Sequence, residues 1–216
     1  MLAVKYLIVN FKTMISIEQI KELRERTGAG VGSVREALES TNGDVEAAIK
    51  YLREKGIAKG EKRKDKVASN GILGTYIHNN NKLVVVVEVA CETDFAANGE
   101  DMKKFARDLA IHIAAVNPKY VSVEAVDAET LKTEKEAAEQ GLEGKPENIK
   151  ESIIQGKLDK FFKETVLLKQ SFFVDESRTV EDALNDMISK IGEKIQITQF
   201  YKVQVSQNPV ISTIFG

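Results

Sequence analysis

Hydrophobic positions in the first quarter of the chain recur with the period of an α-helix. Two stretches open with the Ser-x-x-Glu/Gln spacing of a capping box, at residues 16–19 and 33–36. A third helix is expected from about Asp44, after an Asn-Gly turn, with one apolar face and with Gly56 as its end. The pattern predicts a three-helix docking domain over residues 16–56.

The rest of the chain combines β-branched stretches with further helical ones. Residues 72–78 and 82–91, joined by three asparagines, predict a β-hairpin. A third strand is expected near the C-terminus, and its alternation predicts one shared face for Ile195, Ile197, Tyr201, Val203 and Val205. Helices are expected over residues 100–116, 127–140, 147–169 and 179–192. We therefore expect an α+β fold with a small antiparallel sheet packed on helices, as a core domain over residues 71–206.

A charged run at residues 59–66 separates the two domains and has no apolar period. We interpret it as part of a solvated linker over residues 57–70, because acidic residues dilute its positive charge; a basic contact patch is the alternative. Residues 1–15 are expected to be an extension or a mis-called start. Their apolar stretch is shorter than the ~20 residues of a membrane-spanning helix, so we expect no membrane anchor there. Residues 207–216 form a C-terminal tail.

Composition and charge indicate a globular chain whose partner is another protein. Hydrophobic residues make up 43% and charged residues 30% of its 216 residues, which is ordinary for a folded domain. A formal net charge of −2 argues against a main role in binding nucleic acid. The single cysteine, Cys91, cannot form an internal disulfide, which suits a reducing compartment.

No combination of residues predicts an enzyme, a metal site or a cofactor site. Cys91 with His78 or His112 is a weak candidate for nucleophile and base, because a hydrolase of this kind needs an accessible thiol of low pKa. The glycines of residues 28–32 lie between helices rather than after a strand, so they do not indicate a dinucleotide site. We expect no catalysis, no cofactor and no bound nucleotide.

The most informative stretch follows the Val-rich strand at residues 83–91. Asp94 and Phe95 stand side by side just beyond it, and a Phe in a solvated turn forgoes the roughly 1.5–3 kcal/mol that burial would contribute. One interpretation is local: Phe95 folds back under its strand and Asp94 caps the helix near residue 100. The other is that the pocket for Phe95 lies on another molecule.

This stretch, Cys91-Glu92-Thr93-Asp94-Phe95, resembles the signature of the translation elongation factor Ts family. Further segments resemble the same family in the same order, at residues 20–30, 37–48, 76–78, 117–121, 156–162 and 191–195. Together they span about residues 16–205.

The resemblance implies a guanine-nucleotide exchange factor for the GTPase elongation factor Tu. In that family the Thr-Asp-Phe segment reaches towards the Mg²⁺ site of the GTPase and the Phe acts as a wedge. The residues implied in Mg²⁺ dislocation are Thr93, Asp94, Phe95 and Ala96. Those implied in partner binding by the N-terminal module are Arg24, Gly28, Gly30 and Val31.

The implied partner is elongation factor Tu, GDP-bound or nucleotide-free, with no direct contact to nucleic acid or membrane. The chain resembles the short forms of the family, which leaves a homodimer open. The expected location is the bacterial cytoplasm, with an organelle matrix or stroma as the alternative. The rival function is a UBA-like adaptor or scaffold without exchange activity.

The chain departs from the family pattern at a few positions. Ala96, Ala97 and Asn98 stand where the family commonly has Val, Ala and a cation, and Gln199 stands where it tends to have Arg. We expect the first departure to weaken the contact with the partner's pocket.

Overall fold

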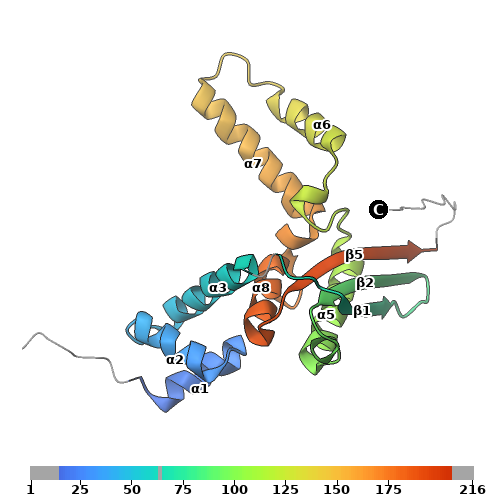
Figure 1. Ribbon diagram of the computed structural model, residues 1–216. Helices are drawn as coiled ribbons and strands as arrows, with labels where there is room; N and C mark the ends of the chain where they lie inside the picture. Colours follow the sequence, from blue (N-terminus) through green and yellow to red (C-terminus); the bar gives the residue numbers. More distant parts are fainter. Residues whose placement is uncertain (1–14, 63–64, 206–216) are drawn as a thin grey trace, which may run out of the picture. The chain divides into compact units, whose positions relative to one another are not determined.

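The computed structural model describes residues 15–62 and 65–205 (Figure 1). Almost all of the predicted extension at residues 1–15, and the whole tail at 207–216, lie outside the described residues. The chain divides into two compact units: one runs to Val67 and also includes Leu184–Lys194, and the other comprises Ala68–Ala183 and resumes at Ile195. The predicted α+β class, with N-terminal helices before a core that contains an antiparallel sheet, is confirmed.

The first unit contains the helices α1 (Ile17–Thr27), α2 (Val31–Ser40) and α3 (Val45–Lys62). The capping box at α1 is present: Ser16 Oγ accepts the N–H of Gln19, and Gln19 Oε1 accepts the N–H of Ser16. The apolar faces of the three helices meet in a buried core of Leu23, Ala29, Val34, Ala37, Leu38, Ala48 and Leu52. Burial of these faces, more than helix propensity, stabilises helices of this length.

Two predicted helix boundaries are wrong. The capping box at residues 33–36 does not exist, because α2 begins earlier, at Val31, with Gly30 as an N-cap that makes no side-chain bond. Gly28 adopts a left-handed conformation (φ 66°) that reverses the chain directly after α1, so α2 starts sooner than the pattern suggested.

Gly56 does not end α3, which continues to Lys62 into the predicted linker. It is buried where α3 meets α8 (Val180–Ile191), and a Cβ on Gly56 would lie 3.0 Å from the carbonyl oxygen of Asn185. The glycine therefore allows two helices to approach closely, which is a packing role and not a stop signal.

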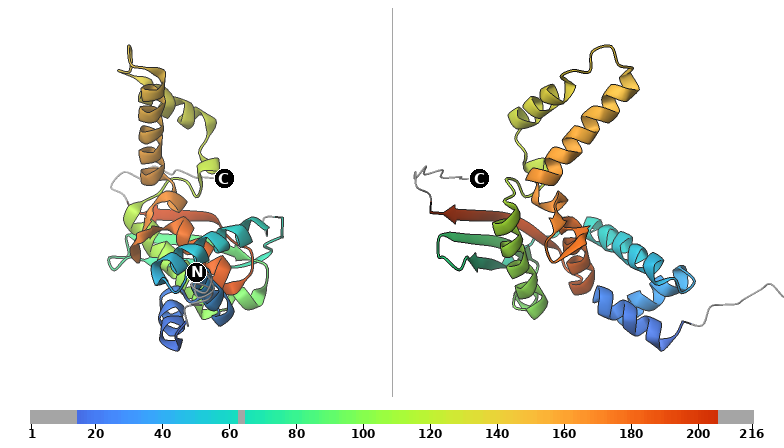
Figure 2. Two further views of the ribbon diagram at one scale, coloured as in Figure 1. Left: turned by 90° about the vertical axis from the view of Figure 1, so that its left-hand side faces the viewer. Right: turned by 180° about the vertical axis from the view of Figure 1, so that it is seen from behind.

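The sheet of the second unit has the order β1 (Asn70–Ile77), β2 (Leu83–Cys91), β5 (Ile195–Gln204), with both pairs antiparallel. Helix α5 (Glu100–Val116) lies across one face of it (Figure 2). Gly74 lets the helix approach, because a Cβ there would lie only 2.1 Å from the carbonyl oxygen of Ala106. Val85, Val87 and Val89 of β2 are fully buried on this covered face.

The predicted shared face of β5 is wrong in its second half. A β-bulge shifts the register, since Val89 pairs with Ile197 whereas Glu88 pairs with Gln199, which leaves Thr198 as an extra residue. Ile195 and Ile197 face α5, but the later residues of the predicted face are turned to the other side. The uncovered face therefore carries apolar side chains from all three strands, half-buried or exposed: Leu73, Ile77, Val84, Val86, Tyr201 and Val203.

The remaining elements of the second unit are helical, apart from a small hairpin. After the short α4 (Asp94–Ala97) and α5 come α6 (Ala128–Glu139) and α7 (Glu147–Thr165), which lie side by side in Figures 1 and 2. The helix predicted over 147–169 ends at Thr165 and is followed by a short 3-10 helix, η2 (Leu167–Lys169). A two-stranded sheet of β3 (Ser171–Phe172) and β4 (Asp175–Thr179) follows, which the sequence did not predict.

Candidate functional site

The connection from β2 to α5 presents one large apolar side chain to solvent. Phe95 is 90% exposed, whereas Ala96 and Ala97 beside it are buried. The local interpretation is therefore wrong: Phe95 does not fold back under its strand. Nor does Asp94 cap α5, whose N-cap is Gly99 without a side-chain bond.

Hydrogen bonds hold the backbone at the start of this turn. Asn70 Nδ2, on the first residue of β1, donates to the carbonyl oxygen of Glu92 (2.8 Å). The Cys91 thiol donates to the carbonyl oxygen of Thr93 (3.2 Å), and Thr93 Oγ1 accepts the N–H of Ala96 (3.2 Å) as the N-cap of α4. The strand end and the first turn of α4 thus form one connected structure.

The four residues predicted for Mg²⁺ dislocation divide into two groups. Thr93, Asp94 and Phe95 are exposed, but Ala96 is only 5% exposed and packs inward where α4 meets β1 and β2. A larger side chain at residue 96 would have to fit inside the unit, so Ala96 supports the turn and offers little surface to a partner. The roles of all four remain predictions.

The N-terminal candidates lie where α1 ends and α2 begins. Arg24 is exposed in the last turn of α1, and its carbonyl oxygen accepts the N–H of Gly28 (2.7 Å). The side chain of Lys190, from α8, passes within 3.3 Å of where a Cβ on Gly28 would be. Gly30 caps α2, and Val31 is half exposed. All four candidates are exposed and lie within residues 24–31 of the first unit, although Ala29 in the same stretch is buried.

The histidines and the cysteine have hydrogen-bond partners within the chain. His112 is fully buried: its Nδ1 accepts the N–H of Phe173 (3.2 Å), so Nε2 carries the proton and donates to Gln170 Oε1 (3.0 Å). Burial lowers the pKa of His112, and the hydrogen bond to Gln170 opposes that shift only in part. Cys91 is buried, and Tyr76 Oη lies 2.9 Å from His78 Nδ1.

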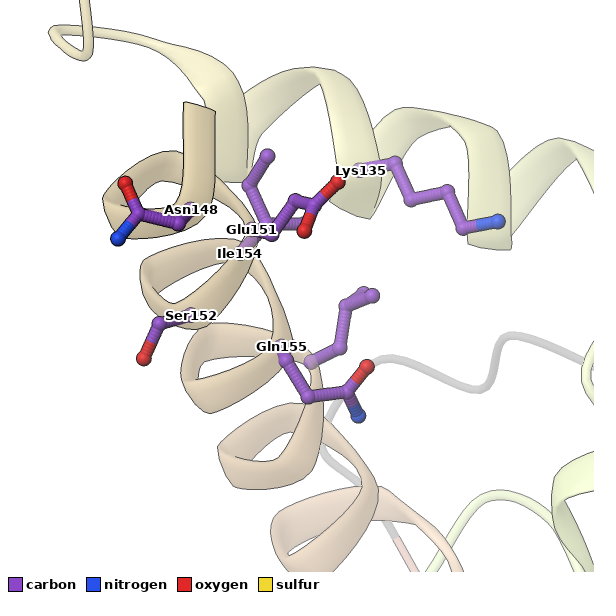
Figure 3. A pocket seen from close by; sticks show the side chains of 7 residues that line it. Lys135, Asn148, Glu151, Ser152, Ile154 and Gln155 are labelled. Atoms are coloured by element: carbon purple, nitrogen blue, oxygen red, sulfur yellow. The ribbon is translucent and has the colours of Figure 1, made fainter. Parts of the chain in front are cut away.

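Within residues 15–62 and 65–205, no group of three or more His, Cys, Asp or Glu side chains is arranged to hold a metal ion. A shallow pocket between α6 and α7 is lined by Lys135, Glu151 and neighbouring side chains that are mostly exposed (Figure 3). It has no enclosed polar centre that would orient a small ligand. Among the described helices, none is long and apolar enough to cross a membrane.

Sequence reasoning missed two residues that shape the turn. Asn98, treated only as a departure from a family pattern, donates from Nδ2 to the carbonyl oxygen of Asp94 (2.9 Å). Its spacing of four residues from Asp94 was a readable signal, since a short polar side chain at this spacing can bond back to the backbone. Asn70, 22 residues from Glu92, had no such local signal.

Comparison with known proteins gives consistent matches over most of the chain. The family model described as Elongation factor TS matches residues 10–187. The chain is 48% identical to an elongation factor Ts of Herpetosiphon aurantiacus, over 90% of this chain and 99% of the relative. It is 47% identical to those of Caldanaerobacter subterraneus subsp. tengcongensis (88% and 96% covered) and Moorella thermoacetica (92% and 99% covered).

Proposed function

Because the chain belongs to the elongation factor Ts family, we propose that it is a guanine-nucleotide exchange factor that binds elongation factor Tu. The family acts in the elongation stage of protein synthesis. The observation that carries the proposal is Phe95, an aromatic side chain 90% exposed on a turn whose backbone is held by hydrogen bonds. A side chain presented in this way suits insertion into a pocket of a partner protein.

The proposed mechanism requires binding energy and no covalent step, so the chain acts as a binding protein and not as an enzyme. The first unit docks through Arg24 and the loop from Gly28 to Val31. Phe95 enters between elements of the GTPase, and Asp94 disturbs the ligands of its Mg²⁺. Because Mg²⁺ requires near-ideal octahedral geometry, a small displacement of one ligand weakens the hold on the ion and on GDP.

Release of the factor follows from linkage. If binding of this chain lowers the affinity of the GTPase for GDP by some factor, nucleotide lowers the affinity for this chain by the same factor. Entry of GTP into the emptied site therefore displaces the factor. The cycle needs no nucleotide site on this chain.

Release of fluorescent GDP from the cognate elongation factor Tu tests the proposal. We expect micromolar concentrations of the chain to accelerate release to a plateau, with excess unlabelled nucleotide preventing rebinding. An adaptor of the rival kind, which would bind ubiquitin-like or nascent-chain partners, would not retain elongation factor Tu in a pull-down and would leave the release rate unchanged. Absence of acceleration would overturn the exchange proposal.

We also propose that two copies of the chain pair through the uncovered face of the sheet. That face carries Leu73, Ile77, Val84, Val86, Tyr201 and Val203, a larger apolar surface than single scattered residues would give. Sheets pack face to face through apolar side chains, and a twofold axis makes one such face complementary to itself. We place the protein in the bacterial cytoplasm, as for relatives from bacteria.

A further inference from the structure

We propose that Asn98 is a positioning residue that closes the one-turn helix α4 and so orients Phe95 towards the partner. The functional part of this inference rests on the proposed exchange activity, whereas the positioning itself concerns this chain alone. Nothing in the family resemblance assigns a role to an asparagine at this position, because the family commonly has a cation there.

Asn98 donates two hydrogen bonds to the same carbonyl group. The carbonyl oxygen of Asp94 accepts two hydrogen bonds from Asn98, one from the backbone N–H (3.0 Å) and one from Nδ2 (2.9 Å). Two further backbone bonds close the turn, from Ala97 N to the Thr93 oxygen and from Gly99 N to the Ala96 oxygen. The side-chain amide of Asn98 therefore donates one of the four hydrogen bonds that close this turn.

A helix this short needs such help. Helix α4 comprises four residues, Asp94–Ala97, and a first turn fixes several dihedral angles for few hydrogen bonds, so it is not stable in isolation. Thr93 secures its start, since Oγ1 accepts the N–H of Ala96. Asn98 secures its end, and Phe95 is one of the four residues that lie between these two caps.

Phe95 cannot be oriented by its own packing, because 90% of it is exposed. Its direction must come from the backbone, which the buried Ala96 and Ala97 anchor on one side and the two caps fix along the chain. A pre-oriented side chain loses less conformational freedom when it binds, and this raises affinity without any new contact.

The amide of Asn98 and a long cationic side chain at this position would act differently. A long cation could reach a partner but would not make the same short bond back to the carbonyl of its own turn. The amide of Asn98 instead satisfies a backbone carbonyl within the chain. Asn98 thus adds a hydrogen bond within its own turn, where a longer side chain would extend away from it.

The test uses a fluorescent reporter in the full-length chain, which contains no natural tryptophan. Phe95→Trp places a single indole at the site, and its time-resolved anisotropy reports the local order of the side chain. Asn98→Ala removes the donor, and Asn98→Asp keeps the shape but places a carboxylate oxygen against the Asp94 carbonyl. Glu100→Gln, at an exposed neighbour outside the turn, is the matched control.

We expect both Asn98 variants to lower the anisotropy of this indole and the control to leave it unchanged. In the Phe95 background, the maximal rate of GDP release should fall about two- to five-fold for Asn98→Ala, as for the loss of one exposed hydrogen bond. Asn98→Asp should lower it further, and thermal melting should confirm that every variant remains folded.

The outcomes separate this inference from the proposed function. If the indole loses order in the Asn98 variants but the chain accelerates no GDP release at all, the positioning role stands and the exchange proposal fails. If exchange is normal in wild type and the indole keeps its order in both Asn98 variants, the inference is overturned. A slower exchange with unchanged order of the indole also overturns it, because Asn98 would then act by contact with the partner.

Discussion

The backbone N–H of Phe173 donates to Nδ1 of His112 at 3.2 Å, which joins the hairpin of β3 and β4 to the buried side of α5. A proton on Nδ1 would oppose this bond, and burial already lowers the pKa of His112. The neutral imidazole is the form that the folded protein requires.

The first prediction concerns stability at mildly acidic pH. Since the pKa of His112 is lower in the folded than in the unfolded chain, the unfolded chain binds more protons below the ordinary pKa of about 6.5. The lowered pKa of His112 adds its full share to the free energy of unfolding above a pH of about 6.5. That share declines as the pH falls from there towards the pKa of the folded state, by at most about 1.4 kcal/mol per pH unit. Urea unfolding at pH 7.5 and 5.5 measures it.

His112→Gln is the comparison variant, because it cannot take up this proton. It should be less stable than wild type at pH 7.5, yet lose less stability between the two pH values. The pKa of Asp127 is also lowered, mainly by the hydrogen bond from the N–H of Thr130. It changes the free energy of unfolding only at lower pH, where an aspartate takes up its proton. Equal pH dependence in wild type and variant would contradict the role given to His112.

The second prediction is that Phe95→Ala reduces the maximal acceleration of GDP release by at least ten-fold. Truncation of a central aromatic anchor typically removes about 2 kcal/mol or more of binding energy, which is about a thirty-fold effect. Val116→Ala, at another exposed apolar residue of the same unit, should leave exchange unchanged. Because Phe95 packs little within the chain, the melting temperature should stay the same; an unchanged plateau rate would remove the wedge from the mechanism.

The third prediction separates docking from displacement. Arg24→Ala should raise the concentration of factor that gives half-maximal exchange, with little change in the plateau rate. The reason is that Arg24 belongs to the first unit, whereas Asp94 and Phe95 belong to the other. Titration of the factor against a fixed amount of GTPase gives both quantities, and a loss of plateau rate alone would contradict this division.

The fourth prediction is that a charge on the uncovered sheet face prevents pairing of two copies. Val203→Glu places a carboxylate at a position whose side chain is 63% exposed, so it should leave the monomer folded. Sedimentation velocity should show a concentration-dependent dimer for wild type and a monomer for the variant. Lys202→Gln, one residue away on the covered face, is the control for changes in β5 itself. A wild-type chain that stays monomeric at high concentration would rule out the dimer.

The fifth prediction compares two glycines. Gly74→Ala should destabilise the chain by about 1–3 kcal/mol or more, because its Cβ would lie 2.1 Å from the Ala106 carbonyl oxygen. Gly156→Ala, in the interior of α7 with nothing within 4 Å of its Cβ, should stabilise by up to about 1 kcal/mol. Chemical unfolding of both variants measures the difference, and a Gly74→Ala variant as stable as wild type would contradict the close approach of α5.

The features that sequence reasoning predicted correctly depend on nearby residues. The capping box of Ser16 and Gln19 involves residues three apart, and it formed as expected. The three strands of the larger sheet, β1, β2 and β5, were predicted from runs rich in β-branched residues. Prediction failed where a feature depends on a residue far along the chain. Gly56 was expected to end α3, but it lies within the helix and allows the close approach of Asn185.

The site shows the same limit. The sequence singled out Asp94 and Phe95 by their position after a strand, but exposure is a property of the packed molecule. The structure established that Phe95 points outward, since its side chain is 90% exposed while Ala96 and Ala97 beside it are buried. The bond from Asn70 to Glu92 joins the first residue of β1 to the residue just after β2, and it could not be inferred without the register of the two strands.

The bulge at Thr198 has a consequence for how β5 tolerates change. Before it, even-numbered residues such as Gln196 face away from α5; after it, even-numbered residues such as Phe200 and Lys202 face towards the helix. A scan of all substitutions along β5 should therefore show that odd-numbered positions are the sensitive ones before Thr198 and that even-numbered positions are the sensitive ones after it. Substitutions at the outward residues Tyr201 and Val203 should therefore leave the packing of Ile195 and Ile197 in the core undisturbed.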